Sequence, residues 1–187
     1  MQETIFIDSD ILFMFFALNE EKINNFHSSG TTGNLELDGI INLINEIESK
    51  NQVIYLSEFS ILEIVCVLNR LNSSYKTGEI LTKIYRICDV LPLNDQMIKL
   101  AWYIGSNYTL HSGDALHISF CLFNNIFNLI IKDTEFYNAI INLRTDLKNN
   151  GTQNLIDYFD SISFSRGVPD TILRKFNNLN KLKIRKI

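Results

Sequence analysis

Short apolar runs alternate with segments of helical periodicity along most of this chain. The runs are compact enough to form buried strands, and they lie at residues 4–8 (TIFID), 52–57 (QVIYLS), 90–94 (VLPLN) and 127–133 (FNLIIKD). Between them, apolar residues recur at the spacing of a helix, as at positions 37, 40, 41, 43, 44 and 47. Strands that alternate with helices predict an α/β fold with a mainly parallel sheet.

The remaining pattern predicts where helices and loops lie. A helix or apolar segment is expected over 11–18, and helices over 37–47, 59–71, 79–87, 95–104 and 111–124, with another near Phe136. The segment 59–71 (FSILEIVCVLNRL) carries apolar residues around most of its circumference, which predicts a helix buried on more than one side. Residues 27–34 (HSSGTTGN) have the composition of a loop.

The composition, 46% hydrophobic and 20% charged over 187 residues, is that of a folded globular protein. Three cysteines stand singly among apolar residues and are expected to be reduced core residues, namely Cys66, Cys88 and Cys121. No apolar run reaches the roughly 18 residues of a membrane span, and the start lacks the order of a signal peptide. We therefore expect a cytoplasmic protein that makes no membrane contact.

Charge is unevenly distributed along the chain. The net charge is −4, yet residues 171–187 carry six basic side chains and no acidic one. An acidic body with a basic tail results.

Two carboxylates stand where predicted strands end. Asp8 closes the run TIFID and Asp133 closes FNLIIKD. In open parallel sheets, ligands bind beyond the carboxyl ends of the strands, so both positions are candidates for chemistry. At Asp8 three interpretations stay open: a nucleophile, a metal ligand, or the polar end of a strand. An aspartate in the position of Asp133, taken by itself, is more often a turn residue that ends a strand than a ligand.

Glu63 and Asp114 are further candidates, and each has a simpler alternative. The Glu63 carboxylate projects from an otherwise apolar face of its helix, near Phe59. Because burying an unpaired carboxylate is costly, Glu63 is expected to have a cation or a metal as its partner. The alternative is a capping box in which Glu63 reaches back to the Ser60 amide. Asp114 falls in the first turn of its helix, behind Ser112 as a candidate cap, where an acidic residue also favours the helix dipole.

Taken as a set, these four carboxylates predict a metal site. Carboxylates that converge at one edge of a sheet repel each other strongly unless a divalent cation neutralises them. Oxygen ligands of this kind suit Mg²⁺ or Mn²⁺ and not zinc.

The ordered motifs resemble those of the PIN-domain ribonuclease family, which includes the VapC-type toxins. The similarity runs from about residue 4 to residue 136. Residues 90–120, which contain GDALHISF, resemble the family's D-A-L-H-x-A segment, and 129–136 (LIIKDTEF) resemble its T-x-D-x-x-F segment. Two positions depart from the family pattern: Ile131 replaces the usual Thr or Ser, and Ser119 the usual Ala.

The resemblance implies a fold, a domain organisation and a set of site residues. The fold would be a three-layer α/β sandwich with a mainly parallel central sheet flanked by helices. Residues 1–145 would form the nuclease domain, with a loop insertion near 27–36, and 146–187 a partly helical C-terminal extension with a basic tail. The implied catalytic residues are Asp8, Glu63, Asp114 and Asp133; the implied metal ligands are Asp8, Asp114 and Asp133, with Glu63 and Asp10 as further ligands.

The function implied by the resemblance is that of a metal-dependent endoribonuclease that hydrolyses RNA, as the toxin of a toxin–antitoxin pair or a related protein. Mg²⁺ or Mn²⁺ would be the cofactor, and a small antitoxin and a second copy of the chain would be protein partners. Since an acidic site does not attract RNA, basic residues elsewhere must contact phosphate. The candidates are Lys181, Lys183, Arg185 and Lys186 in the tail, and the scattered Arg70, Lys76, Lys83 and Arg86.

Two alternatives stay open at this point. The stretch IFIDSDIL also resembles the D-x-D motif of haloacid-dehalogenase-like phosphatases, in which Asp8 would be the nucleophile and Asp10 the acid and base. That motif normally continues with Thr where this chain has Leu12, and it would leave Glu63 and Asp114 unused. The other alternative is a catalytically inactive PIN-like module that binds RNA or protein.

Overall fold

The computed structural model describes residues 3–18, 20–70, 77–162 and 167–187, so Lys76 lies outside the described residues. Contacts divide the chain into two compact units. The first comprises residues 1–91 together with Ile187, and the second comprises residues 92–186.

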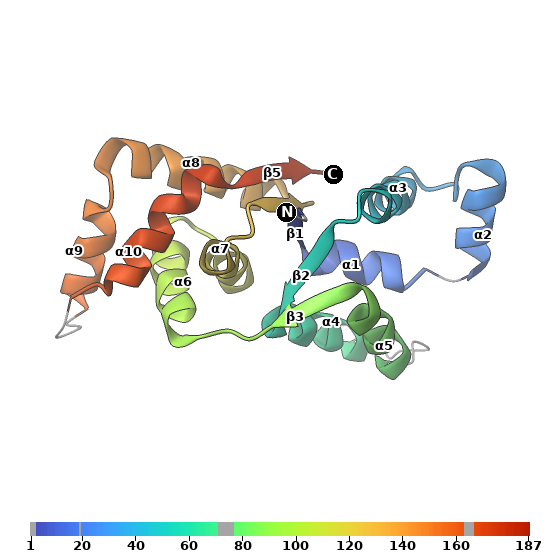
Figure 1. Ribbon diagram of the computed structural model, residues 1–187, viewed down its shortest axis with the longest axis horizontal. Helices are drawn as coiled ribbons and strands as arrows, with labels where there is room; N and C mark the ends of the chain where they lie inside the picture. Colours follow the sequence, from blue (N-terminus) through green and yellow to red (C-terminus); the bar gives the residue numbers. More distant parts are fainter. Residues whose placement is uncertain (1–2, 19, 71–76, 163–166) are drawn as a thin grey trace. The chain divides into compact units, whose positions relative to one another are not determined.

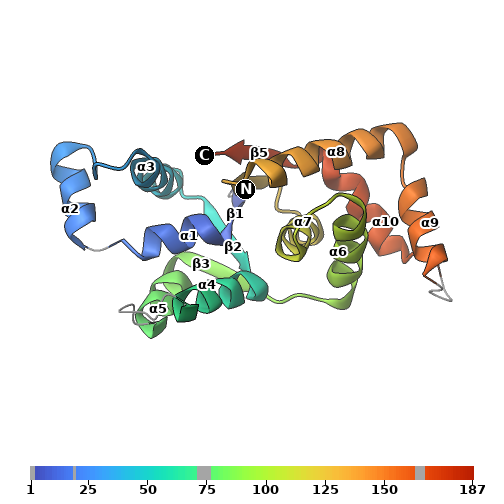
Figure 2. The ribbon, with the colours of Figure 1, turned by 180° about the vertical axis from the view of Figure 1, so that it is seen from behind.

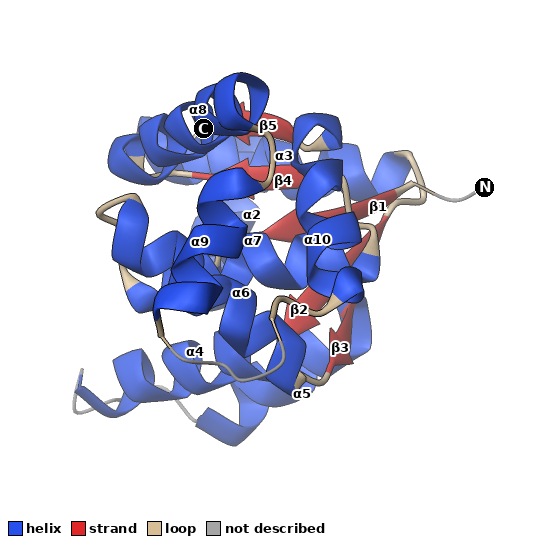
Figure 3. Cartoon of the chain, turned by 90° about the vertical axis from the view of Figure 1, so that its left-hand side faces the viewer, coloured by secondary structure: helices blue, strands red, loops and turns tan. Residues whose placement is uncertain are grey.

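The first unit contains three parallel strands, β1 (Thr4–Ile7), β2 (Val53–Ser57) and β3 (Cys88–Leu91). β2 lies between the other two, with Ile54 opposite Ile5 on one side and opposite Cys88 on the other (Figure 3). Three consecutive residues of β1 are buried, namely Ile5, Phe6 and Ile7. Burial on both faces of a strand is typical of parallel sheets, because helices cover both sides.

The described residues of this unit also form the helices α1 (Ser9–Phe16), α2 (Glu20–Ser29), α3 (Leu35–Ser49), α4 (Glu58–Arg70) and α5 (Thr77–Ile87) (Figure 1). α1 contacts α3, α4 and α5, while α4 and α5 contact β2 and β3 respectively. α2 lies beyond α1 and α3, away from the strands (Figures 1 and 2). It packs through Ile23 and Phe26 against a small buried cluster of Leu18, Leu37 and Ile41.

The segment predicted as a loop over 27–34 is shorter in the structure. α2 continues through Ser29, and only residues 30–34 separate it from α3. Asp38 in the first turn of α3 closes this loop, since its carboxylate accepts hydrogen bonds from the Thr31 hydroxyl and from the Thr32 amide and hydroxyl, each at 2.6 Å. These bonds hold the pKa of the Asp38 carboxyl below its usual value, with the Thr31 hydroxyl as the largest cause.

α4 is buried along one stripe, so the prediction of burial on more than one side is wrong. Its buried residues are Ser60, Ile64 and Leu68, which repeat every fourth position. Leu62 on another face is 56% exposed, and Cys66 is exposed as well. The apolar composition of a helix indicates that it can be buried, but it does not show how many elements pack against it. The described neighbours of α4 leave the side with Leu62 and Cys66 open.

The second unit contains α6 (Asp95–Asn107), α7 (Ser112–Asn124), β4 (Asn128–Ile131), α8 (Thr134–Asn150), α9 (Gln153–Ser161), α10 (Asp170–Phe176), the 3-10 helix η1 (Asn177–Lys181) and β5 (Lys183–Lys186) (Figure 2). α6 and α7 pack closely at Gly105: a Cβ placed on this residue would lie only 3.6 Å from the Cβ of Ala115. The hydroxyl of Ser119 donates to the Met97 carbonyl at 2.7 Å, which ties the two helices together through a buried bond.

Residues beyond 145 contribute to the packing of the second unit. β5 pairs with β4 in parallel, with Ile131 opposite Lys186. The Arg144 guanidinium on α8 donates to the carbonyls of Leu179 and Leu182, directly before β5. Burial lowers the pKa of Arg144. These bonds satisfy carbonyls at the turn that leads into the strand.

Each strand pairing described within the two units is parallel, as expected for an α/β fold. Two of the three cysteines are buried as expected, and burial raises the pKa of Cys88 to about 12, while Cys66 is exposed. Among the residues described, no helix combines the length and the apolar character needed to cross a membrane.

Candidate active site

Asp8 is both the end of a strand and the cap of a helix. It directly follows β1 and is the N-cap of α1, where its Oδ1 accepts from the Asp10 amide at 3.4 Å and lies 3.5 Å from the Ser9 hydroxyl oxygen. The side chain is largely buried, with 8% of the residue exposed. Asp10, one position into the helix, is exposed. A carboxylate fixed in this way is oriented before any ligand arrives.

Glu63 contacts the beginning of α1. Its Oε2 accepts a hydrogen bond of 2.9 Å from the Ser9 hydroxyl, 54 positions earlier in the chain. The Ser60 amide donates instead to the hydroxyl of Ser57, at 3.0 Å. Ser57 therefore caps this turn of α4, and Glu63 is directed toward Ser9 and not into a capping box with Ser60.

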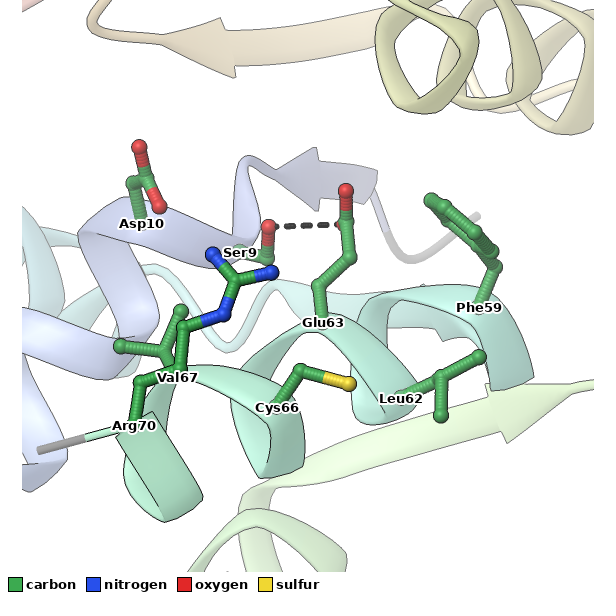
Figure 4. A pocket seen from close by; sticks show the side chains of 8 residues that line it. All are labelled: Ser9, Asp10, Phe59, Leu62, Glu63, Cys66, Val67 and Arg70. Carbon is green, nitrogen blue, oxygen red and sulfur yellow. Dashed lines mark hydrogen bonds between the residues drawn. The ribbon is translucent and has the colours of Figure 1, made fainter. Parts of the chain in front are cut away.

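A cavity of about 300 Å³ opens along this contact (Figure 4). Its lining residues come from the start of α1 and from one side of α4: Ser9, Asp10, Phe59, Leu62, Glu63, Cys66, Val67 and Arg70. In Figure 4 the Glu63 carboxylate points toward Ser9, while Phe59 and Arg70 stand on opposite sides of Glu63 along the helix. The cavity thus combines acidic, cationic and aromatic side chains within the first unit.

Asp114 and Asp133 belong to the second unit. Asp133 follows β4 and is the N-cap of α8, where its Oδ1 accepts from the Glu135 amide at 2.5 Å and from the Phe136 amide at 3.3 Å. Asp114 is half-buried in the first turn of α7. The N-cap of α7 is His111, which makes no side-chain capping bond, so Ser112 is already inside the helix.

The structure brings Asp8, Ser9 and Glu63 together through the Ser9 hydroxyl, and it describes Asp114 and Asp133 within the other unit. Within the described ranges, no group of three or more His, Cys, Asp or Glu side chains is arranged to hold a metal ion. The donors at these positions are carboxylate and hydroxyl oxygens, and such a donor set fits Mg²⁺ or Mn²⁺ in chemistry.

The basic side chains of the C-terminal tail lie on and next to β5. Lys181, Lys183, Arg185 and Lys186 are exposed. The Lys181 ammonium lies 5.7 Å from the centre of the Phe127 ring, and the Lys186 ammonium donates to the hydroxyl of Thr134, the residue after Asp133. A cation from the last strand is therefore held beside the start of α8.

Two features of the site escaped sequence reasoning. The sequence analysis did not identify Ser9, which lies between two aspartates in the chain. Ser9 is 6% exposed and joins Asp8 to Glu63. Its position in the first turn after a strand-ending aspartate was the available signal. The contact of Lys186 with Thr134 had no local signal, because it depends on the parallel register of β4 and β5.

Parallel strands with carboxylates directly after β1 and β4 define an α/β protein whose candidate chemistry lies at strand ends. The chain belongs to the PIN-domain family: the family model, described as PIN domain, matches residues 36–141, more than half of the sequence. The match includes Glu63, Asp114 and Asp133 and begins after Asp8. No curated protein and no solved structure gives a significant match.

Membership confirms the PIN resemblance and the fold class, a PIN-like three-layer α/β sandwich with a mainly parallel central sheet. Proteins of this family are generally nucleases, and therefore hydrolases, that act on RNA and typically use divalent metals such as Mg²⁺ or Mn²⁺. The match favours the PIN family over the haloacid-dehalogenase-like phosphatases, which shared only the D-x-D motif.

Proposed function

We propose that this protein is a metal-dependent endoribonuclease that hydrolyses RNA phosphodiester bonds with Mg²⁺ or Mn²⁺. Its acidic residues would be Asp8, Glu63, Asp114 and Asp133, as the family resemblance implies. The observation that carries the proposal is the Ser9 hydroxyl, which links the strand-ending Asp8 to Glu63 in a chain of the PIN family.

The proposed roles follow from the donor chemistry. Asp8, Asp114 and Asp133 would hold the metal, with Asp10 as a lesser ligand. A bound divalent ion lowers the pKa of water and offsets charge on phosphorus oxygens. Glu63 would orient the attacking water, and the bond from Ser9 to Oε2 holds its carboxylate in position. The N-cap bonds of Asp8 and Asp133 fix both carboxylates by their Oδ1 atoms.

The decisive experiment replaces Asp8 with Asn. Asn is as good an N-cap as Asp, so Asp8→Asn should keep the fold while removing the charge that a metal requires. We expect loss of Mn²⁺-dependent cleavage of single-stranded RNA and loss of the Mn²⁺ binding heat in calorimetry. Glu58→Gln, an exposed carboxylate change at the start of α4, is the control and should cleave normally. Unchanged cleavage by Asp8→Asn would refute the assignment.

RNA would be held by the basic residues around β5. One test of this contact would delete residues 177–187, which contain these basic side chains. That deletion would remove η1 and β5 as well as the charges, so charge substitutions are the sharper test. The double change Lys183→Gln and Arg185→Gln should weaken RNA binding and flatten its dependence on salt, because fewer counterions are released from the RNA. An unchanged slope would mean that these two residues do not contact RNA.

The proposal extends to a toxin role, with a small antitoxin that covers the site and a homodimer as the assembled state. Co-expression with the product of a short adjacent reading frame should suppress RNA cleavage, and sedimentation should give twice the chain mass. Cleavage that no neighbouring gene product suppresses would favour a nuclease outside toxin–antitoxin pairs. Binding of RNA without cleavage would favour the inactive module.

A further inference from the structure

We propose that one face of α4, formed by Phe59, Glu63 and Arg70, is a subsite for a nucleotide of single-stranded RNA. The Phe59 ring would stack on a base, and the Arg70 guanidinium would bind a phosphate. This inference rests on the proposed ribonuclease function and adds a substrate contact that the four carboxylates cannot make.

The spacing of these residues places them on one side of α4. Positions 59, 63, 66, 67 and 70 recur every three or four residues, and all five line the cavity. Phe59 and Arg70 are eleven positions apart in the chain, so their Cα atoms lie about 16 Å apart along the helix axis. The face therefore has separate places for an aromatic contact and a cationic contact, with Glu63 between them (Figure 4).

Arg70 places a guanidinium group, which can bind phosphate, beside acidic residues that would otherwise repel RNA. Its guanidinium points toward Ser9 and Glu63 in Figure 4, and no hydrogen bond or ion pair holds it within the described residues. Guanidinium presents a fork of donors that matches phosphate, and it would offset repulsion between the acidic site and RNA. Arg86 instead lines a different cavity, beside apolar residues such as Phe15 and Leu18.

Phe59 and its neighbours offer an apolar surface for a base. The ring is half-buried at the end of the cavity away from Arg70, and Leu62 and Val67 add apolar area. An aromatic side chain binds single-stranded nucleic acid by stacking on a base, which a duplex does not expose. The pairing of Phe59 with Arg70 therefore predicts a preference for single-stranded over double-stranded RNA.

The test measures binding without cleavage. A fluorescent single-stranded RNA is titrated with the Asp8→Asn protein at several salt concentrations, and the same is done after adding Arg70→Gln or Phe59→Leu. Arg70→Gln should lower the slope of log K against log salt by about 0.7, the value for one phosphate contact in single strands. Phe59→Leu should weaken binding about tenfold and leave the slope unchanged. Phe59→Tyr, which keeps the ring, should bind normally.

Arg174→Gln is the matched control, because Arg174 is also an exposed arginine in the last turn of its helix and the charge change is identical. It should bind RNA like the Asp8→Asn parent. If Arg70→Gln and Phe59→Leu also bind like the parent, the subsite is refuted, whether or not the wild type cleaves RNA. If instead the wild type fails to cleave while both variants lose affinity, the ribonuclease proposal fails and the subsite stands as an RNA-binding site.

Discussion

At the scale of single residues, Asp8 and Asp133 each serve the fold before any chemistry is considered. Both follow a strand and cap the next helix through Oδ1. The simpler interpretation of Asp133, a polar residue at a strand end, therefore describes its structural role correctly. A capping role and a metal role are compatible, since the amide bonds described for Asp133 go to one oxygen. Variants at these positions must separate the two roles.

Asp133 allows that separation. Asp133→Asn keeps a capping oxygen and should change the free energy of unfolding by a few tenths of a kcal/mol, whereas Asp133→Ala should cost about 1 kcal/mol. If the proposed metal role holds, both variants should lose RNA cleavage. Urea unfolding and a cleavage assay measure the two effects. Equal destabilisation by Asn and Ala would contradict the capping argument.

Asp38 predicts a response of stability to acid. Its pKa is lower in the folded protein than in the unfolded chain because Thr31 and Thr32 bond the ionised carboxylate. Ionised Asp38 therefore stabilises the fold above the unfolded pKa, near 4, and this stabilisation is lost as the pH falls through the lower folded pKa. Unfolding free energies should fall more steeply from pH 5 to pH 3 in the wild type than in Asp38→Asn. Parallel pH profiles would contradict this.

At the scale of elements, helix pairs are held by a few specific contacts besides apolar burial. Ser119 on α7 illustrates this, because it departs from the family's usual Ala and uses its hydroxyl to reach the Met97 carbonyl on α6. α4 illustrates the converse. Its apolar residues suggested burial on several sides, but one stripe faces the interior and another lines the cavity beside Glu63. The exposed apolar residues of α4 belong to the lining of this cavity, where we propose that RNA binds.

The Ser119 contact can be tested directly. Ser119→Ala should destabilise the protein by about 0.5–1.5 kcal/mol, the net contribution of a typical buried hydrogen bond. Ser112→Ala, an exposed change on the same helix, should leave the unfolding midpoint in urea unchanged. A neutral Ser119→Ala would show that the small Ala usual in the family packs equally well.

At the scale of the whole molecule, residues after 145 are integrated with the second unit. β5 pairs with β4, and the carbonyls before β5 accept from Arg144. The basic charges noted in the sequence are therefore presented by an ordered strand, and Lys186 reaches Thr134 beside Asp133. An acidic set of site residues and a basic strand are carried by the same chain, whose net charge is −4.

Arg144 tests this integration. Arg144→Met leaves the carbonyl of Leu182 without its described donor, whereas the Leu179 carbonyl keeps the bond from the Leu182 amide, and the change should cost about 1–3 kcal/mol. Hydrogen exchange should accelerate mainly at the amides of β5, because its attachment to α8 is weakened. Arg174→Met, a change at an exposed residue of α10, should leave exchange unaltered. Uniform acceleration across the second unit would argue against a local role for Arg144.

The sequence by itself determined most strands and helices up to the start of α8, the two aspartates at strand ends and the resemblance to the family, because these depend on periodicity and short motifs. Most predicted elements lie within a few residues of the observed ones; α2 was missed because its polar residues lack an apolar period. Only the tertiary structure decided which side of α4 is open, that Ser9 joins Asp8 to Glu63, and that the basic tail is a strand. Each of these depends on contacts between residues far apart in the chain, which local patterns do not specify.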